Sequence, residues 1–290
     1  MSLILFLLFA VCSAVFAGLT SILAKCGLQK ADSTLVTALR TIVAMLFAWA
    51  IVAIGGTYSQ IPDISVRGWI FLILSGLSTG ASWLCYFKAL QMGDVNKVVP
   101  VDKSSNVLAI LLAIIILGET LSAFGIIGVV LITIGTMLMI EKKDVAEVKD
   151  TNAGWLLFAI GSAVFAALTS ILGKLGMEGI DSNLGTAIRT VVVLLMSWMM
   201  VMIMKKGSSI HDIGKKDMMF IIVSGIATGA SWMFFFAALQ SGPASVIIPI
   251  DKLSILLVIL FAYIVFKEKL SKKSSIGLIA IVAGTLLLLV

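Results

Sequence analysis

The sequence predicts an all-α membrane protein of ten transmembrane helices, built as two inverted repeats of five helices each. Three observations lead to this fold class. Hydrophobic residues make up 60% of the chain and charged residues only 12%, the apolar residues form runs of membrane-spanning length, and the second half of the chain repeats the first. The mean hydropathy of +1.16 lies far outside the range of soluble domains.

The apolar runs predict five spans in each half of the chain. About 20 residues cross a hydrocarbon core, and these runs are apolar throughout, whereas the strands of a barrel would alternate. The spans expected in the first half are 2–24, 33–55, 67–91, 95–117 and 121–140. Those expected in the second half are 153–173, 182–204, 217–240, 244–266 and 272–290. The first span has no basic segment before it, so we expect a retained helix and not a signal peptide.

The two halves align without a gap at an offset of 149 residues. The first repeat takes residues 1–141 and the second 153–290, joined by a charged linker at 142–152. Since each copy holds an odd number of spans, the second copy must cross the membrane in the opposite direction. Inverted repeats of this kind are typical of secondary transporters.

The basic residues follow the predicted topology. The net charge is +6, but the lysines concentrate in the odd-numbered connections, as at Lys142, Lys143 and Lys149 between the fifth and sixth spans. We therefore expect no nucleic-acid partner. The positive-inside rule places these connections in the cytoplasm and both termini outside.

Small residues and a proline recur in a recognisable order along each half. The third span holds Ser75–Gly80 and then Ala89-Leu90, the fourth bears a proline and ends in Leu117–Glu119, and the fifth holds Gly128 and Gly135. In this duplicated order the chain resembles the EamA type of the drug/metabolite transporter superfamily over nearly its whole length. The resemblance implies two five-helix domains and transport of a small solute. Such proteins are usually drawn with both termini in the cytoplasm, and the lysines of this chain depart from that pattern.

Charged residues inside the spans are the candidates for a solute site, because each costs roughly 2.5–3.5 kcal/mol at a membrane centre. We expect Arg40 and Arg189 to bind a carboxylate or phosphate of the substrate. Prolines one turn before the other charges should break those helices, and interrupted helices mark binding sites in inverted-repeat transporters. The predicted gating or coupling residues are Asp102, Lys103, Asp251 and Lys252, and the predicted helix breaks are at Pro100 and Pro249.

A purely structural alternative stays open for the charges. Arg40 with Asp102, or Arg189 with Asp251, would then be ion pairs that only fix the helix packing. The duplication of the charges beside prolines favours a water-filled cavity. Aromatic side chains would form the apolar part of its wall, although interfacial anchoring explains them equally well. These aromatic candidates are Trp83, Tyr86, Trp232 and Phe235.

The function expected from these features is secondary active transport of a small polar metabolite, with one repeat rocking against the other. An amino acid or a related organic anion or zwitterion suits the predicted wall, and Asp102 and Asp251 would carry protons if transport is proton-coupled. The direction of transport stays open, export included. No enzymatic activity, catalytic residue, cofactor or metal site is expected. The expected partners are the small-molecule substrate and membrane lipid, and both a monomer and a homodimer are compatible with the duplication.

Two alternatives differ in class from a metabolite carrier. A multidrug exporter of quaternary cations would be expected to carry an acidic residue in its first helix, and residues 1–31 contain none. A lipid-carrier flippase, or a membrane scaffold with no solute cycle, would be distinguished by a lateral opening toward lipid. The expected location is the inner membrane of a prokaryotic cell.

Overall fold

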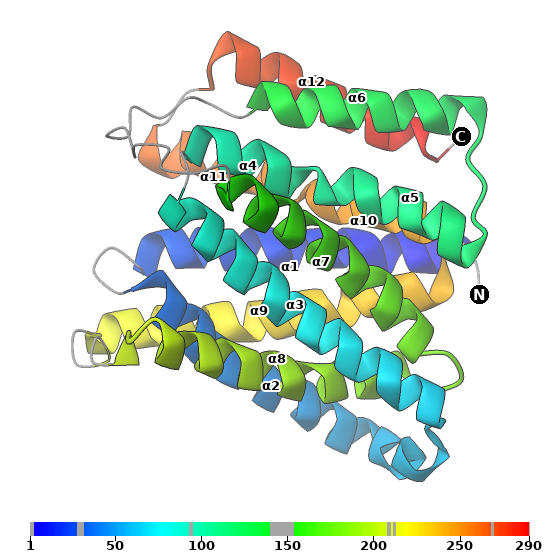
Figure 1. Cartoon of the computed structure of the whole chain (residues 1–290), viewed down its shortest axis with the longest axis vertical. Coiled ribbons are helices and arrows are strands. Elements are labelled where there is room, and N and C mark those ends of the chain that lie inside the picture. The colour runs from blue at the N-terminus through cyan, green and yellow to red at the C-terminus, as the bar shows by residue number, and fades with distance from the viewer. Residues whose placement is uncertain are drawn as a thin grey trace.

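The computed structural model describes residues 3–27, 32–92, 95–139, 154–207, 210, 213–267 and 270–289. All regular structure in these residues is helical (Figure 1). The first half forms α1 (Leu3–Gly27), α2 (Ser33–Gly55), the 3-10 helix η1 (Thr57–Asp63), α3 (Val66–Met92), α4 (Val95–Lys103), α5 (Ser105–Leu117) and α6 (Ala123–Met139). The second half forms α7 (Gly154–Gly176), α8 (Ser182–Ile203), α9 (Lys215–Ser241), α10 (Ala244–Lys252), α11 (Ser254–Phe266) and α12 (Lys272–Leu287).

Duplicated aspartates begin the second helix of each half. The carboxylate of Asp32 accepts hydrogen bonds from the first backbone amides of α2, and Asp181 does the same for α8. These amides have no partner inside the helix, so a carboxylate there satisfies them and favours the helix dipole. Burial raises the pKa of Asp32, but hydrogen bonds from Lys206 and from the α2 backbone hold that pKa below its ordinary value.

The spans predicted at 95–117 and 244–266 are each two helices in the structure, not one. The first divides at Ser104 and the second at Leu253. Pro100 and Pro249 lie one turn earlier, where a proline has no amide hydrogen to give to the preceding turn. At the first break, the Ser104 amide donates to the carbonyl oxygens of Pro100 and Val101 at 3.3 and 3.2 Å. Each break therefore follows directly after an Asp-Lys pair.

Eight segments of the described chain are long and apolar enough to cross a membrane. The helices α6 and α12 are shorter, with 17 and 16 residues. At a rise of 1.5 Å per residue, 17 residues extend about 26 Å, somewhat less than a typical hydrocarbon core. The helical membrane fold is thus confirmed, whereas the count of ten spans stays a prediction.

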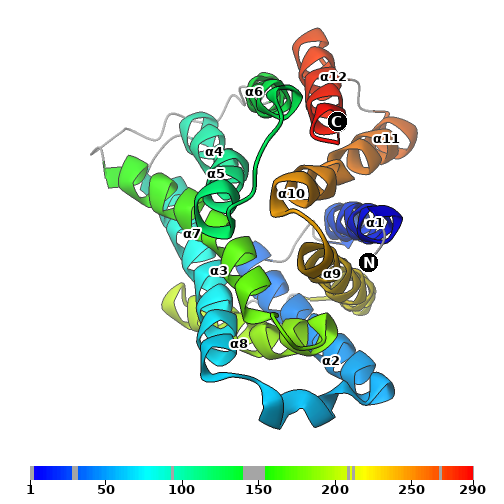
Figure 2. The ribbon, with the colours of Figure 1, turned by 90° about the vertical axis from the view of Figure 1, so that its right-hand side faces the viewer.

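The two halves interlock, as Figures 1 and 2 show. The most extensive helix contacts join α3 to α7, α1 to α9, α6 to α12 and α2 to α8. Exchanging the two copies of the repeat converts the α3–α7 contact into the α9–α1 contact and leaves the α2–α8 and α6–α12 contacts unchanged. The first helix of each half is therefore buried by the third helix of the other half.

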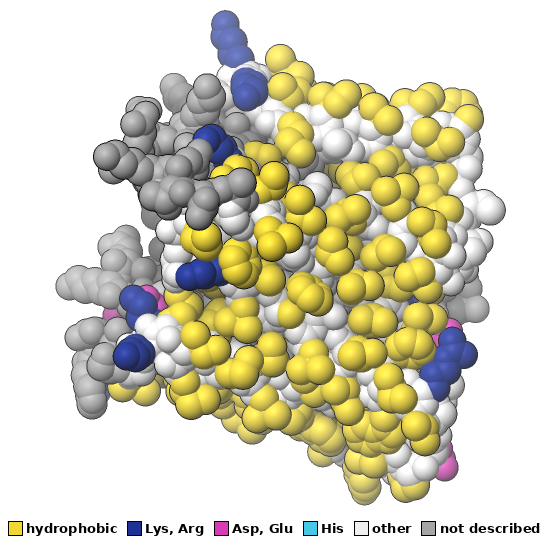
Figure 3. Space-filling view, in the orientation of Figure 1, with side chains coloured by type: hydrophobic (Ala, Val, Ile, Leu, Met, Phe, Trp, Pro, Cys, Tyr) yellow, Lys and Arg dark blue, Asp and Glu magenta, His cyan; other side chains and the backbone are white. Residues whose placement is uncertain are grey.

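The outer surface is apolar between its two ends. Figure 3 shows hydrophobic side chains over the whole middle of this face, with Lys and Arg gathered mainly at one edge. The helix α1 begins and α12 ends at the opposite edge (Figure 1). The band of exposed large side chains includes Ile4, Ile115, Leu157 and Ile279, which are between 67% and 77% exposed. Apolar exposure on this scale fits contact with lipid.

Candidate functional site

The two Asp-Lys pairs lie at matching places on α4 and α10. A carboxylate oxygen of Asp102 lies 4.0 Å from Nζ of Lys103, and the corresponding distance from Asp251 to Lys252 is 3.6 Å. Adjacent residues on a helix point about 100° apart. The flexible lysine stem nevertheless bends back far enough for each ammonium group to meet its neighbouring carboxylate.

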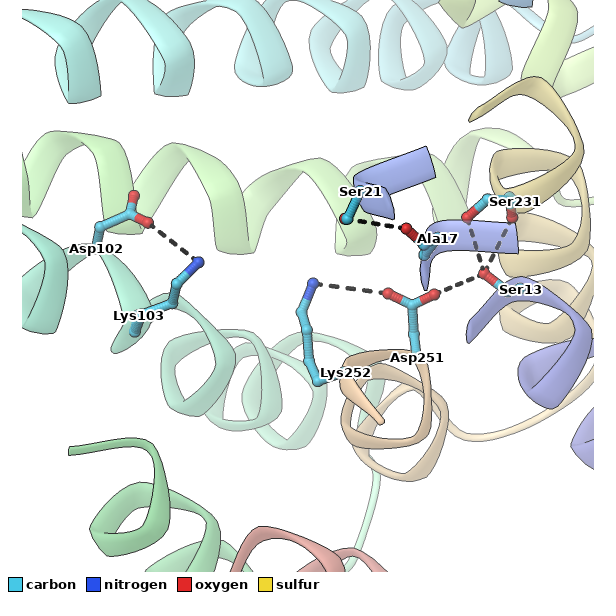
Figure 4. A network of polar contacts seen from close by, with 8 residues as sticks. All are labelled: Ser13, Ala17, Ser21, Asp102, Lys103, Ser231, Asp251 and Lys252. Carbon is cyan, nitrogen blue, oxygen red and sulfur yellow. Dashed lines mark hydrogen bonds and ion pairs between the residues drawn. The ribbon is translucent and has the colours of Figure 1, made fainter. Parts of the chain in front are cut away.

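Serines from the opposite repeat hold the two carboxylates. Ser162 on α7 donates a hydrogen bond to Asp102 at 2.7 Å. Ser13 on α1 donates one to Asp251 at 2.6 Å, as Figure 4 shows. Ser13 also lies 3.4 Å from the hydroxyl of Ser231 on α9. These short contacts are charge-assisted hydrogen bonds, and each one ties the broken helix of one repeat to the first helix of the other.

Both lysines are in contact with solvent-accessible space although they lie inside membrane-spanning segments. The side chain of Lys103 is 53% exposed and that of Lys252 is 51% exposed, whereas Asp102 and Asp251 are 18% and 14% exposed. Figure 4 shows the two lysines between the two aspartates, and the charges of the lysines act on one another. The aspartates are thus the anchored members of the pairs and the lysines the accessible ones.

Arg189 on α8 is buried and well supplied with partners. Only 1% of this residue is exposed. Its guanidinium donates to the hydroxyls of Ser75 at 3.2 Å and Thr79 at 2.8 Å on α3, and it lies over the rings of Phe236 and Trp232 at 4.3 and 5.6 Å. Contact with an aromatic face stabilises a desolvated cation. Arg189 therefore joins α8, α3 and α9 in this conformation.

Arg40, the counterpart of Arg189 on α2, is partly buried and has no hydrogen-bond or ionic partner among the described residues. By symmetry its partners would be Ser224 and Thr228 on α9. Those hydroxyls donate to the carbonyl oxygens of Thr20 and Ser224, just as Ser75 and Thr79 donate to the carbonyl oxygens of Thr169 and Ser75, but in the described residues they accept no hydrogen bond from Arg40. The two arginines thus occupy equivalent positions in the sequence but different environments. Within the described residues, the alternative pairing of these arginines with the aspartates is not observed.

Two of the predicted aromatic residues, Tyr86 and Phe235, belong to matched ring pairs. Tyr86 packs edge-to-face on Phe87 with centroids 5.8 Å apart, and Phe235 packs in the same way on Phe236 at 5.3 Å. Phe235 packs against the main buried core, and Tyr86 packs against a smaller cluster between α3, α4 and α7. Trp83 is partly buried on α3.

A second polar cluster lies at the end of the bundle where α1 begins. Glu119, directly after α5, accepts hydrogen bonds from the Ala244 and Ser245 amides at the start of α10 and pairs with Lys174 at 3.3 Å. Lys174 also donates to the Gly242 carbonyl at 2.6 Å. Burial raises the pKa of Glu119, but the hydrogen bonds from Ser245 and Ala244 and the charge of Lys174 outweigh that effect and hold the pKa below its ordinary value.

The two ends of the bundle differ in how closely the repeats are joined, and the Glu119 cluster lies at the more closely joined end. Helices α5 and α10 are in contact across the repeats at the end where Glu119 lies. The symmetry-equivalent helices are α4 and α11, and within the described residues they make no contact of comparable extent. The two repeats are therefore joined more closely at one end than at the other.

Comparisons with known proteins agree with this architecture. A family model described as "EamA-like transporter family" matches residues 4–141 and again residues 153–290. The chain belongs to the EamA-like transporter family. A Sinorhizobium sp. protein named "Uncharacterized transporter in cobO 3'region" is 43% identical over 130 residues, which is 45% of this chain and 92% of that protein. A solved structure described as "Crystal structure of protein" has a TM-score of 0.80 at 16% identity and covers 97% of this chain and 95% of its own, which shows the fold alone.

The EamA-like family assignment confirms the resemblance drawn from the duplicated small-residue order. The protein is an integral membrane transporter, and the family implies a small-molecule substrate. The family does not identify that substrate, so the roles of the individual polar residues stay predictions. No group of three or more His, Cys, Asp or Glu side chains suited to a metal ion is found in the described part of the chain.

Prediction from the sequence did not identify the serines that donate hydrogen bonds to Asp102 and Asp251. Ser13 and Ser162 lie in apolar runs where a serine attracts no notice, yet they are 149 residues apart and so belong to the duplicated set. Ser82 and Ser231, which contact them, are duplicated in the same way. A search for polar residues preserved in both copies would have found all four.

Proposed function

We propose that this EamA-like protein is a secondary transporter that carries a small polar metabolite through the space between its two repeats by alternating access. The main support is the unequal contact at the two ends of the bundle. The α5–α10 contact, with Glu119 on the start of α10, closes one end, while in the described part of the chain α4 and α11 make no contact of comparable extent. An alternating-access cycle exchanges these two arrangements.

The inverted repeat supplies the reason why such an exchange is energetically feasible. In Figure 1, α1 and α7 run in opposite directions, which supports the predicted inversion. Two oppositely oriented copies of one fold have two packings of similar energy, because each copy adopts in one state the conformation that the other adopts in the next. The proposed motion therefore needs no external scaffold.

The two arginines take part in the proposed exchange. Arg189 contacts Ser75 and Thr79 in the present arrangement, while Arg40 has no such partners among the described residues. In the reversed state we expect Arg40 to bind the equivalent hydroxyls of Ser224 and Thr228. Each arginine would then be released in turn, and the released one would be available to the carboxylate or phosphate of a passing substrate.

The aspartates are the proposed proton carriers of a proton-coupled cycle. Asp102 and Asp251 are the acidic residues held within the broken helices, each on a serine of the opposite repeat. Protonation would weaken the charge-assisted hydrogen bond and so loosen one contact between the repeats. Proton binding would in this way change the stability of one conformation relative to the other.

The membrane orientation proposed here places the lysine-rich edge in the cytoplasm and both termini outside, in the inner membrane of a prokaryote. Figure 3 supports this arrangement because Lys and Arg gather at the edge away from the ends of the chain. The less closely joined end, where the described residues of α4 and α11 make no contact of comparable extent, lies on that lysine-rich side (Figure 1). The present conformation would accordingly accept solute from the cytoplasm.

Distance measurement between spin labels tests the cycle itself. In a background without Cys12, Cys26 and Cys85, labels at the exposed residues Gln91 and Lys267 report on the gap between the α4 and α11 ends. We expect two distance populations in liposomes, with the shorter one favoured by substrate. A single distance under all conditions would contradict alternating access.

A solute panel tests the class of substrate. Purified protein in liposomes is given labelled amino acids, dicarboxylates, sugar phosphates and quaternary amines, and saturable transport is measured against empty liposomes. Transport of a polar metabolite supports the proposal. Transport confined to quaternary amines would instead identify a multidrug exporter, and movement of lipid alone would identify a lipid-carrier flippase.

A further inference from the structure

Two lysines near the centre of the protein are placed unlike the other intramembrane charges. Lys103 is the last residue of α4 and Lys252 the last residue of α10, inside the spans Lys97–Leu117 and Ala244–Val265. A charge at that depth is unfavourable unless it faces water, a partner or a ligand. Both side chains are about half exposed, whereas Arg189 is enclosed by hydroxyls and rings.

Their aspartate partners neutralise the two lysines only in part. Charge-assisted hydrogen bonds from nitrogen to oxygen are usually about 2.7–2.9 Å long, and the contacts of Lys103 and Lys252 are 4.0 and 3.6 Å. A lysine has three donors. Within the described residues, neither ammonium group has a further hydrogen-bond acceptor. The carboxylates meanwhile direct their other oxygen to Ser162 and Ser13, on the side away from the lysines.

The two ammonium groups also act on one another. The charge of Lys252 acts on Lys103, and in Figure 4 the lysines are the inner pair between the two aspartates. Two like charges in a partly desolvated site repel each other. An anion between them replaces this repulsion with two attractions, and it satisfies donors that the protein leaves unused.

We propose that Lys103 and Lys252 together form a site for one oxyanion group, a carboxylate or a phosphate, which both repeats hold at once. This site rests on the transport function proposed above and identifies the chemical group of the substrate that the two repeats share. It assigns the first anion contact to the lysines, because they come from both repeats at once; Arg189 already donates to Ser75 and Thr79, and Arg40 remains available to a second polar group of the substrate. Binding there bridges α4 of the first repeat and α10 of the second, so occupancy affects their separation directly.

The test is ligand-dependent thermal unfolding of the full-length purified protein, with inorganic phosphate and succinate as separate probes at constant ionic strength. A ligand that binds only the folded state raises the unfolding midpoint in a saturable way. We expect at least one probe to do so, and the responding probe distinguishes a phosphate site from a carboxylate site. Glycerol serves as the uncharged comparison.

Four variants decide whether the site is shared. Lys103→Gln and Lys252→Gln should each raise the apparent Kd at least about tenfold. The apparent Kd of the double variant should be only slightly higher than that of the weaker-binding single variant, because both residues bind one group. Lys216→Gln removes an exposed lysine at the start of α9 and should bind like the unmodified protein. If a Gln variant does not fold, the corresponding Arg variant, Lys103→Arg or Lys252→Arg, takes its place in the comparison. Arginine keeps the positive charge, so we expect a smaller rise in the apparent Kd.

The outcomes separate this site from the transport function. Absence of a saturable shift with both probes, unchanged binding in the two Gln variants, or dependence on only one lysine would overturn the shared oxyanion site. The spin-label pair at Gln91 and Lys267 is measured on the same samples. Two interconverting distances without probe binding reject the site and leave the transporter proposal intact, whereas one fixed distance rejects the transporter proposal.

Discussion

Ser13 on α1 donates its hydroxyl hydrogen to Oδ1 of Asp251 on α10 across 2.6 Å, although 238 positions separate the two residues. The equivalent bond from Ser162 on α7 to Asp102 on α4 is 2.7 Å long. Each bond joins the first helix of one repeat to the broken helix of the other. The serine–aspartate bonds at the polar centre of the protein therefore join one repeat to the other.

Replacement of these serines should destabilise the protein. In Ser13→Ala or Ser162→Ala a partly buried carboxylate loses its hydroxyl donor, so we expect the free energy of unfolding to fall by about 1–2 kcal/mol. Denaturant titration in mixed micelles measures this fall in the free energy of unfolding. Ser21→Ala on the same helix removes only an exposed bond to the Ala17 carbonyl and should change stability by less than about 0.5 kcal/mol. Equal effects of Ser13→Ala and Ser21→Ala would contradict the assigned role.

Acid should weaken the contact that Glu119 makes with the start of α10. The pKa of Glu119 is lower in the folded protein than its ordinary value of 4.5, so the unfolded chain binds the proton more tightly. The stabilisation is fully present above about pH 4.5 and is lost as the pH falls through the lower folded pKa. Glu119→Gln should lower the unfolding midpoint at neutral pH and reduce its acid dependence. Glu178→Gln, at an exposed position, is the control, and a Glu119→Gln protein with the acid dependence of that control would refute the prediction.

The contact between α6 and α12 should not tolerate a larger residue at Gly135. A Cβ atom built there would lie 2.5 Å from the backbone oxygen of Gly277, so the two helices would have to separate. We expect Gly135→Ala to lower the free energy of unfolding by about 1–3 kcal/mol. Gly125 lies on the same helix, and its nearest neighbours would be 3.4 Å away. Gly125→Ala should therefore be nearly neutral, and the difference between the two unfolding curves is the measurement.

The two arginines should differ in their contribution to stability. Arg189→Ala removes two hydrogen bonds and the contact with the Phe236 ring, for an expected loss of about 2–4 kcal/mol. Arg40→Ala should cost less, because the described residues give Arg40 no comparable partners. Both variants are compared by denaturant titration in the same micelles. An equal loss in the two variants would show that the environments are equivalent in solution.

Proton coupling should depend on the aspartates. An Asn at position 102 or 251 keeps an oxygen for the serine hydroxyl but carries no acidic proton, so Asp102→Asn and Asp251→Asn should flatten the pH dependence of transport. Transport into liposomes at a series of pH values measures this. Asp63→Asn, at the exposed last residue of η1, should keep the original profile. A profile unchanged in both site variants would exclude the aspartates as proton carriers.

The sequence predicted the helices well because membrane spans have a strong local signal. The ranges 33–55 and 182–204 match α2 and α8 to within one residue. Prediction was weaker where tertiary contacts decide the outcome. The pairing of Asp102 with Ser162 depends on which helix of the other repeat lies beside α4, and the difference between Arg40 and Arg189 depends on the conformation. The local sequence is Arg-Thr in both copies, so it does not predict that difference.

The interlocked packing has a consequence for the order in which the protein is made. Ser13 leaves the ribosome long before its acceptor Asp251 and its neighbour Ser231, which follow 238 and 218 positions later. Until α9 and α10 are inserted, the Ser13 hydroxyl lacks these two partners. Ser162, by contrast, enters a membrane that already holds Asp102. The contact between Ser162 and Asp102 can therefore form during synthesis before the contact between Ser13 and Asp251, so that α7 can pack on α3 before α1 can pack on α9.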